Sequence, residues 1–257
     1  MLLATWNVNS VRARLPRLLP WLERRRPDIV CLQETKVVDE EFPVAEIGAL
    51  GYRCIVWGQK TYNGVAVLSR EDPTDVSYGL PDDLDDAERR VVAVPVDNIR
   101  VVSVYVPNGK DVTHPAHIQK LEWLARFRQF VAGACAAGTE VAICGDFNIA
   151  PEERDVWDVD LWQGRNLFTE PERAAFRSLL ACGLVDTLRL HHPAAGLYTW
   201  WDYRQGAFHR GWGLRIDHVL ASLPLAARCL SVEVDRNERK GDKPSDHAPL
   251  LAQFASR

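Results

Sequence analysis

Residues 140–146, EVAICGD, and residues 28–34, DIVCLQE, share one pattern: a short, mainly apolar run leads directly into a carboxylate. Runs of this length that contain β-branched residues predict buried strands. Residues 214–217, LRID, repeat the pattern. We therefore expect acidic groups where strands leave a sheet, which is a common way to build a site on a rigid frame.

Short apolar runs dominate the rest of the chain, and convincing helical patterns are few. Two runs flank Asp97-Asn98, and strands around a turn-forming pair of this kind predict a β-hairpin. Strands are expected near residues 2–6, 28–33, 52–57, 64–69, 90–96, 100–106, 140–146, 197–201, 215–221, 228–234 and 249–254, and helices near residues 14–25, 116–132 and 171–181. The second helix is expected to bury one face made of Ile118, Leu121, Leu124, Ala125 and Val131.

This mixture of strands and helices predicts an α/β fold in which two sheets pack face to face with helices outside. No linker or low-complexity segment interrupts the chain, so residues 1–257 are expected to form a single domain.

Composition limits the class of protein. The 257 residues are 47% hydrophobic and 26% charged, which is typical of a globular chain. No apolar run is long enough for a membrane span, so we expect a cytoplasmic protein without a membrane partner. The cysteines are scattered and predict free thiols. The net charge of −4 excludes a generally basic DNA-binding surface, so contacts with nucleic acid would need local basic groups.

Polar groups that could carry chemistry follow the ends of several predicted strands. They lie in residues 5–9 (TWNVN), 32–36 (LQETK), 105–108 (YVPN), 145–148 (GDFN), 214–217 (LRID) and 244–247 (PSDH). Oxygen ligands without a Cys or His cluster favour Mg²⁺ or Mn²⁺ over zinc. Each group alone also fits a structural interpretation, as an Asx turn, a helix cap or a buried hydrogen-bonded carboxylate. Their repeated position at strand ends favours a site.

Eight motifs in register give the chain a resemblance to a known family. The chain resembles the exonuclease III branch of the endonuclease/exonuclease/phosphatase superfamily over almost its whole length. The motifs are TWNVNS (5–10), LQETK (32–36), YVPNG (105–109), GDFNIAP (145–151), GLVDT (183–187), YTWWDYR (198–204), GLRIDHVLAS (213–222) and PSDHAPL (244–250).

The resemblance implies a four-layered α/β sandwich and a DNA-repair hydrolase. The implied reaction cleaves the phosphodiester 5′ to an abasic site in duplex DNA, with 3′-to-5′ exonuclease and 3′-phosphatase or phosphodiesterase activities on blocked 3′ ends. The implied cofactor is Mg²⁺, for which Mn²⁺ substitutes, and the enzyme is expected to be a monomer.

Matching motif positions assign the site residues. Glu34 becomes the principal metal ligand. The remaining expected ligands are Asn7, Asp246, Asp146 and Asn148.

The same residues suggest the reaction chemistry. Asp146 is expected to activate the attacking water or to protonate the leaving oxygen. Asn148 is expected to orient the water, and His247 to donate a hydrogen bond to the phosphate. Asp217 is expected to orient His247, and Tyr105 to bind the phosphate or assist the leaving oxygen. Whether Asp146, Tyr105 or another group is the base stays open.

The resemblance also implies DNA contacts. Trp200, Leu214 and Ile216 are expected to line a pocket for a base-free sugar, although aromatic and aliphatic residues on strands also fit a plain core. Further DNA contacts are expected from Lys36, Asn108, Lys110, Arg204, Trp212 and Arg215. Residues 162–168 are less typical of the family than the segments around them.

Two alternatives are weaker. The same fold could act on RNA or another phosphate ester, but then the WWDYR and GLRID segments would be absent. A non-catalytic binding module would have lost some of the metal or acid-base residues, and all of them are present.

Overall fold

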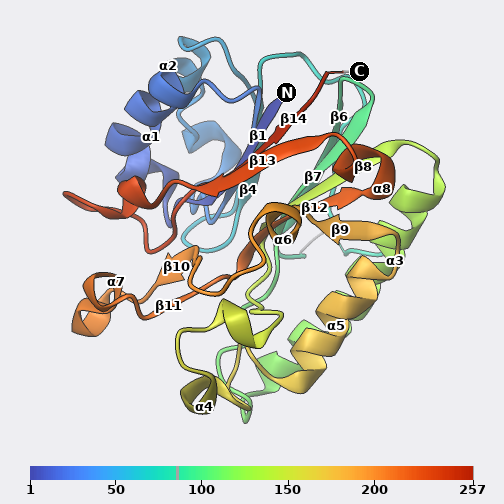
Figure 1. Ribbon diagram of the computed structural model, residues 1–257. Helices are drawn as coiled ribbons and strands as arrows, with labels where there is room; N and C mark the ends of the chain where they lie inside the picture. The colour runs from blue at the N-terminus through green and yellow to red at the C-terminus, as the bar shows by residue number, and fades with distance from the viewer. Residues whose placement is uncertain (85–86, 257) are drawn as a thin grey trace.

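Two six-stranded β-sheets lie face to face in the computed structural model, which describes residues 1–84 and 87–256 (Figure 1). The first sheet has the order β13-β14-β1-β2-β4-β3. Among its described strands, only β1 and β2 run parallel. Its strands are β1 (Leu2–Asn7), β2 (Ile29–Gln33), β3 (Arg53–Trp57), β4 (Val65–Ser69), β13 (Cys229–Val234) and β14 (Leu250–Phe254).

The second sheet has the order β5-β6-β7-β8-β12-β9. In the part of this sheet that the structure describes, only β7 and β8 run parallel. Its strands are β5 (Ser77–Tyr78), β6 (Val91–Val96), β7 (Ile99–Tyr105), β8 (Glu140–Asp146), β9 (Leu184–Asp186) and β12 (Asp217–Ser222). A separate pair, β10 (Trp200–Trp201) and β11 (Gly213–Leu214), lies beside the sheets.

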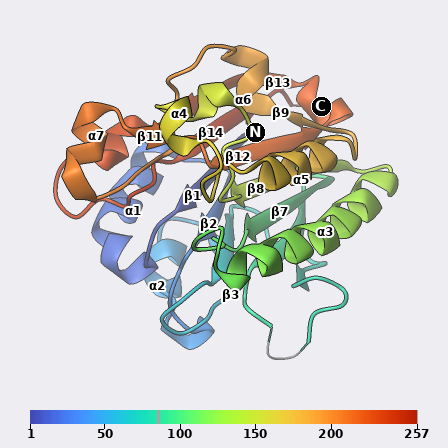
Figure 2. The same cartoon turned by 90° about the horizontal axis from the view of Figure 1, so that it is seen from below.

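Helices cover the outer faces of the two sheets (Figure 2). Helices α1 (Val11–Arg25) and α2 (Val44–Gly48) lie against the first sheet, and α3 (Pro115–Ala136) and α5 (Glu170–Leu180) lie against the second. A third apolar cluster, with residues such as Cys31 and Cys144, fills the space between the sheets. The expected α/β sandwich, with two mixed sheets and helices outside, is confirmed.

Shorter helices lie in the connections. They are α4 (Val159–Trp162), α6 (Thr187–His191), α7 (Ala207–Arg210) and α8 (Leu223–Ala226), with 3₁₀ turns η1 (Asp39–Glu41), η2 (Glu153–Asp155), η3 (Arg204–Gly206) and η4 (Arg236–Arg239).

The long helices differ in detail from the sequence-based expectation. Helix α1 begins three residues earlier, because the Ser10 side chain accepts a hydrogen bond from the Ala13 amide and caps it. Helix α3 buries a face that includes His117 and Lys120, whereas Ile118 is 62% exposed. The prediction of the buried face was therefore partly wrong, because a buried lysine occupies one of the core positions of this helix.

The predicted hairpin is confirmed. Strands β6 and β7 pair with Val96 opposite Ile99. Asp97 and Asn98 both have positive φ, as a two-residue turn that follows the twist of the strands requires.

The region 213–222 does not form one continuous strand. The chain pairs with β10 at Leu214, leaves the ladder at Arg215 and Ile216, and joins the second sheet at Asp217. This break turns the carboxylate of Asp217 towards the end of β8.

Among the described residues, all six cysteines are free. No helix in the described ranges is long and apolar enough to cross a membrane.

Candidate active site

The ends of four strands bring polar side chains to one edge of the sandwich. The parallel pairs β1–β2 and β7–β8 point the same way within their sheets, so their C-terminal ends lie together. Asn7, Tyr105 and Asp146 are the last residues of β1, β7 and β8, and Glu34 directly follows β2. Asp217 pairs with Asp146 in register, at the start of β12.

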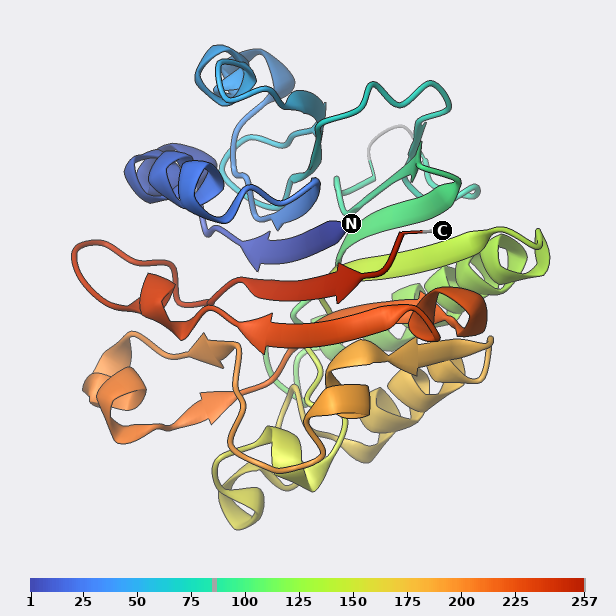
Figure 3. The same cartoon turned by 45° about the horizontal axis from the view of Figure 1, so that its top comes forward.

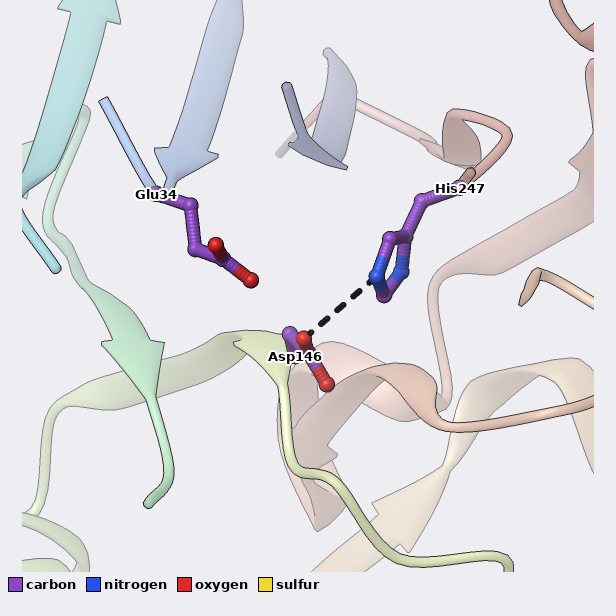
Figure 4. Close-up of side chains that lie close together, drawn as sticks. All are labelled: Glu34, Asp146 and His247. Atoms are coloured by element: carbon purple, nitrogen blue, oxygen red, sulfur yellow. Dashed lines mark ion pairs between the residues drawn. The ribbon is translucent and has the colours of Figure 1, made fainter. Parts of the chain in front are cut away.

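Three side chains form the centre of the site. Glu34, Asp146 and His247 offer ligand atoms that all lie within 4.8 Å of one another. Figure 4 shows them converging from three separate segments, with His247 Nε2 3.7 Å from Asp146 Oδ2. Asn7 connects the two carboxylates, because its Nδ2 donates to Glu34 Oε1 at 2.8 Å and to Asp146 Oδ2 at 2.9 Å.

The imidazole of His247 has a fixed orientation. Its Nδ1 donates to Asp217 Oδ2 at 2.9 Å, and the other oxygen of Asp217 has no partner in the described structure. Burial lowers the pKa of His247, but the carboxylates of Asp217 and Asp146 outweigh this effect and raise the pKa to about 10. The imidazole therefore carries a proton on each nitrogen at neutral pH, and Nε2 faces Asp146 as a donor.

Burial also changes the acid-base chemistry of Asp146. It raises the pKa of Asp146 to about 7; the charge of His247 opposes this shift, while those of Asp217 and Glu34 support it. A carboxylate with this pKa can take up and release a proton near neutrality. Burial and the charges of Glu34 and Asp146 raise the pKa of Tyr105, so its phenol keeps its proton.

The donor set fits a hard divalent cation. Glu34 and Asp146 supply carboxylate oxygens, which Mg²⁺ prefers, whereas the doubly protonated His247 has no free lone pair for a metal. Asn7 directs its Nδ2 to the two carboxylates, while its Oδ1 accepts a hydrogen bond from the backbone N–H of Asn9. In this orientation Asn7 links the carboxylates, and it would have to turn to bind an ion through oxygen.

Asp246 lies beside the central cluster. Its Oδ1 accepts from Asn9 Nδ2 and its Oδ2 accepts from Trp200 Nε1, both at 3.0 Å. Lys36 joins this group, because its Nζ lies 2.6 Å from Asn9 Oδ1 and 2.7 Å from Glu34 Oε2. Asn9 belongs to a quoted motif but was given no role from the sequence; its position two residues after Asn7 on a strand end was the available signal.

Asn148 and Asn108 form a second set of hydrogen bonds that holds Asp146 in place. The backbone N–H of Asn148 donates to Asp146 Oδ1 at 2.8 Å, and Asn108 Nδ2 donates to Asn148 Oδ1 at 2.9 Å. The buried Lys120 donates from Nζ to Asn148 O at 2.7 Å, to Asn108 O at 3.3 Å and to Glu172 Oε1 at 2.5 Å. Sequence reasoning missed Lys120 because it lies within an ordinary helical pattern.

The expected sugar pocket differs from the structure. Trp200 is partly exposed, but Leu214 and Ile216 have only 0% and 1% exposure. The pairing of Trp200 with Leu214 turns the aliphatic side chains into a core cluster with Val156 and Leu167. In the described part of the chain, Leu214 and Ile216 therefore lie in the core, and Trp200 alone of the three predicted residues is partly exposed.

The expected DNA-binding residues are divided between surface and core. Arg215 is fully buried between the carboxylates of Asp155 and Asp186, so it cannot reach a phosphate, and its assignment as a DNA contact was wrong. The sequence could not show that the strand breaks at this residue and turns its side chain inward. Lys110 and Arg204 are exposed, and Arg204 pairs with Asp202.

Comparisons with known proteins identify the family. Residues 4–247 match the Endonuclease/Exonuclease/phosphatase family. The chain is 35% identical to exodeoxyribonuclease III of Haemophilus influenzae, with 97% of this chain and 98% of the relative covered. It is also similar to the solved structure of the 3′ phosphatase NExo (D146N) from Neisseria bound to a product DNA hairpin, with 43% identity, a TM-score of 0.97 and 100% of both chains covered.

A further solved structure, an AP endonuclease from Archaeoglobus fulgidus, is 41% identical with a TM-score of 0.95 and 100% of both chains covered. The chain belongs to the endonuclease/exonuclease/phosphatase family, in its exodeoxyribonuclease III branch.

Proposed function

We propose that this protein is a DNA-repair hydrolase that cleaves the phosphodiester 5′ to abasic sites in duplex DNA. We include 3′-to-5′ exonuclease activity and removal of 3′ phosphates and other 3′ blocks in the proposal. The observation that carries it is the buried array Asp217–His247–Asp146 beside Glu34. The names of the relatives, an exodeoxyribonuclease, a 3′ phosphatase and an AP endonuclease, support the same substrate class.

The proposed cofactor is Mg²⁺, with Mn²⁺ as a substitute. Glu34 and Asp146 would hold it directly, and Asn7, Asp246 and Asn148 are the further proposed ligands. Asn7 and Asn148 each donate a hydrogen bond to Asp146, and Asp246 accepts from Asn9 and Trp200, which supports their assignment. When bound, the cation would supply positive charge that offsets the charge of the phosphodiester.

The side chains around this position have separate roles. His247 would donate from Nε2 to a non-bridging phosphate oxygen, and Asp217 would hold the imidazole in that orientation. Asp146 would accept a proton from the attacking water, which Asn148 helps to orient. Tyr105, whose raised pKa keeps the phenol protonated, would donate to the phosphate or to the leaving oxygen.

DNA would lie across the edge where the strands end. Trp200 is the partly exposed member of the expected sugar pocket, and Leu214 and Ile216 form the core beneath it. Basic, amide and aromatic side chains around the site would contact the duplex: Lys36, Asn108, Lys110, Arg204 and Trp212.

We further propose that the chain is one domain over residues 1–257 and works as a cytoplasmic monomer. One continuous apolar cluster joins the two sheets, which supports a single folding unit. Light scattering of the purified protein gives the oligomeric state.

The test is incision of a labelled duplex that carries one abasic-site analogue, compared with the undamaged duplex and with a duplex that ends in a 3′ phosphate. Each reaction is run with Mg²⁺ and with a chelator. We expect Mg²⁺-dependent cutting at the lesion and release of the 3′ phosphate. Asp146→Asn should lower turnover by about 10²–10⁴-fold, whereas Asp75→Asn, at an exposed position, should leave it unchanged.

The outcomes separate the parts of the proposal. Absence of cutting on all three substrates would overturn it. Release of the 3′ phosphate without incision at the lesion would remove the abasic-site activity and keep the 3′-end activity.

A further inference from the structure

Arg239 is a buried cation near the site that has no part in the reaction proposed above. It is the last residue of η4 and is only 6% exposed. Within the described part of the chain, it forms no ion pair with a carboxylate. Removing a guanidinium from water is costly unless other groups replace the lost hydration. The groups that contact Arg239 therefore indicate what the buried charge does.

The guanidinium joins two main-chain carbonyls. Its Nη1 donates to Ser245 O at 2.9 Å, and its Nη2 donates to Trp201 O at 3.3 Å. Trp201 ends β10, and Ser245 directly precedes Asp246 and His247. A guanidinium is planar and rigid, so it holds two acceptors in a fixed relation to each other. One side chain thus ties β10 to the segment that carries two residues of the site.

Two aromatic rings keep the guanidinium in place. Its central carbon lies 5.0 Å from the centroid of the Phe208 ring and 5.5 Å from that of the Tyr203 ring. Cation–π contacts of this kind replace part of the hydration that the buried charge has lost. Arg239 is therefore held from two sides as well as by its hydrogen bonds.

The segment 244–247 is fixed by donors from other parts of the chain. Each of its four carbonyl groups accepts a hydrogen bond. The donors are Tyr203 Oη for Pro244, Arg239 for Ser245, the backbone N–H of Trp201 for Asp246 and Trp6 Nε1 for His247. Among these four donors only Arg239 is charged, and hydrogen bonds from charged donors are the stronger ones.

Ser245 transmits this hold to the reacting groups. Its Oγ donates to Asn7 O at 2.7 Å and accepts from the backbone N–H of His247 at 3.2 Å. A shift of Ser245 would therefore move the imidazole of His247 relative to Asp146. Misplacement of a reacting group by about 1 Å can lower the rate about 100-fold.

Two simpler roles fit Arg239 less well. A DNA contact needs an exposed cation, and this side chain is buried. Plain support of a carbonyl needs no charge, because the backbone N–H of Trp201 supports the next carbonyl of the same segment.

We propose that Arg239 is a positioning residue for cleavage: its guanidinium holds Ser245 so that Asp246 and His247 face the phosphate. This inference rests on the proposed function and adds to it a residue that touches neither DNA nor the metal ligands.

The first test is the steady-state kinetics of Arg239→Ala on the duplex with one abasic analogue. We expect kcat to fall about tenfold or more, because the imidazole is misplaced, while KM changes little, because the DNA-contacting surface stays. A normal kcat would overturn the proposal.

Chemical rescue distinguishes the missing guanidinium from general damage. Guanidinium chloride, kept well below the concentration that unfolds the variant, is compared with sodium chloride at the same ionic strength, because salt alone weakens DNA binding. We expect guanidinium to restore part of the kcat of Arg239→Ala and sodium to restore none. Equal effects of the two salts would overturn the proposal.

Two further variants complete the set. Arg239→Lys keeps the charge and the stem, which guards against loss of folding, but an ammonium lacks the fork, so its kcat should lie between those of wild type and Arg239→Ala. The matched control is Arg228→Ala, which breaks an ion pair with Glu140 at the opposite end of β8 from Asp146 and should keep kcat. A kcat of Arg239→Lys below that of Arg239→Ala, or an equal loss in Arg228→Ala, would overturn the proposal.

A second readout needs no cutting and separates this inference from the proposed function. The Nδ1 proton of His247, bonded to Asp217, gives an NMR signal that His247→Gln should lack. We expect this signal to shift or broaden in Arg239→Ala and to stay unchanged in Arg228→Ala. An unchanged signal in Arg239→Ala would overturn the positioning role, whereas a wild-type protein that cuts no DNA would remove the proposed function itself.

Discussion

Asp217 holds a buried negative charge whose hydrogen-bond partner is the imidazole of His247. Asp217→Asn keeps a similar shape and removes the charge, so the imidazole loses the group that fixes its orientation and favours its protonated form. We expect kcat to fall at least about tenfold while KM changes little. Steady-state kinetics on a duplex with one abasic analogue measure both constants.

The control for this change is the exposed Asp75→Asn, with circular dichroism to confirm that both variants fold. A normal kcat for Asp217→Asn would show that the imidazole needs no carboxylate.

Gly145, directly before Asp146, lets the backbone of β8 approach the neighbouring strand β7 closely. A Cβ at this position would lie 1.9 Å from the carbonyl oxygen of Val104. We expect Gly145→Ala to lower the free energy of unfolding by about 3 kcal/mol or more, because backbone would have to move. Urea denaturation measures the loss.

Gly133 provides the opposite comparison. It lies inside α3, and a Cβ there meets nothing within 4 Å. Gly133→Ala should raise the stability by about 0.5–1 kcal/mol. Equal effects of the two substitutions would contradict the steric explanation.

At the scale of the elements, the sequence predicted the strands and turns that follow from hydrophobic periodicity and from turn-forming residues. The hairpin around Asp97-Asn98 and the strands expected near residues 2–6 and 140–146 are confirmed, because apolar runs and turn residues act locally. The two-residue strand β5 and the short helices α4 and α7 were missed, because they are too short to show a period.

The same distinction applies to the site. The sequence identified the residues that meet at the strand ends, because parallel strands bring their ends together. It could not show that Arg215 turns inward to Asp155, or that Leu214 joins the same core cluster as Leu167, because these depend on packing between distant segments. Lys120 was missed for the same reason.

Lys120 and Glu172 join α3 to the start of α5 in a fully buried ion pair. Lys120→Met would leave the Glu172 carboxylate buried without its cation, so we expect a loss of about 3–5 kcal/mol in the free energy of unfolding. Adding Glu172→Gln removes that charge and keeps one acceptor oxygen, for the backbone amide of either Leu167 or Thr169. The double variant should therefore be more stable than Lys120→Met alone in urea denaturation.

A double variant less stable than the single variant would show that the charge of Glu172 has another partner. Lys120→Arg keeps the cation and serves as the control for loss of the side chain.

At the scale of the whole molecule, His218 should link stability to pH. Burial, with the charge of Arg215, lowers the pKa of this imidazole to about 4 in the folded protein, while the unfolded chain titrates near 6.5. As the pH falls from about 6.5 to about 4, the unfolded chain binds a proton that the folded protein excludes. The free energy of unfolding should fall by about 3 kcal/mol over this range from His218 alone.

His218→Gln isolates this contribution. His218 Nδ1 accepts from Arg215 Nη1 and Nε2 donates to Ile149 O, and a glutamine offers one acceptor and one donor in their place. The stability of the wild type should decline more steeply below pH 6.5 than that of the variant. Parallel curves would show that the imidazole does not titrate on unfolding.

The pairing of β1 with β14 places residues made early in synthesis against residues made late, with Leu2 opposite Gln253 (Figure 3). While the ribosome still holds residues 250–254, one edge of β1 lacks its partner strand, and His247 has not reached Asp146. A chain whose synthesis stops before residue 247 therefore lacks both the partner strand β14 and the histidine of the site.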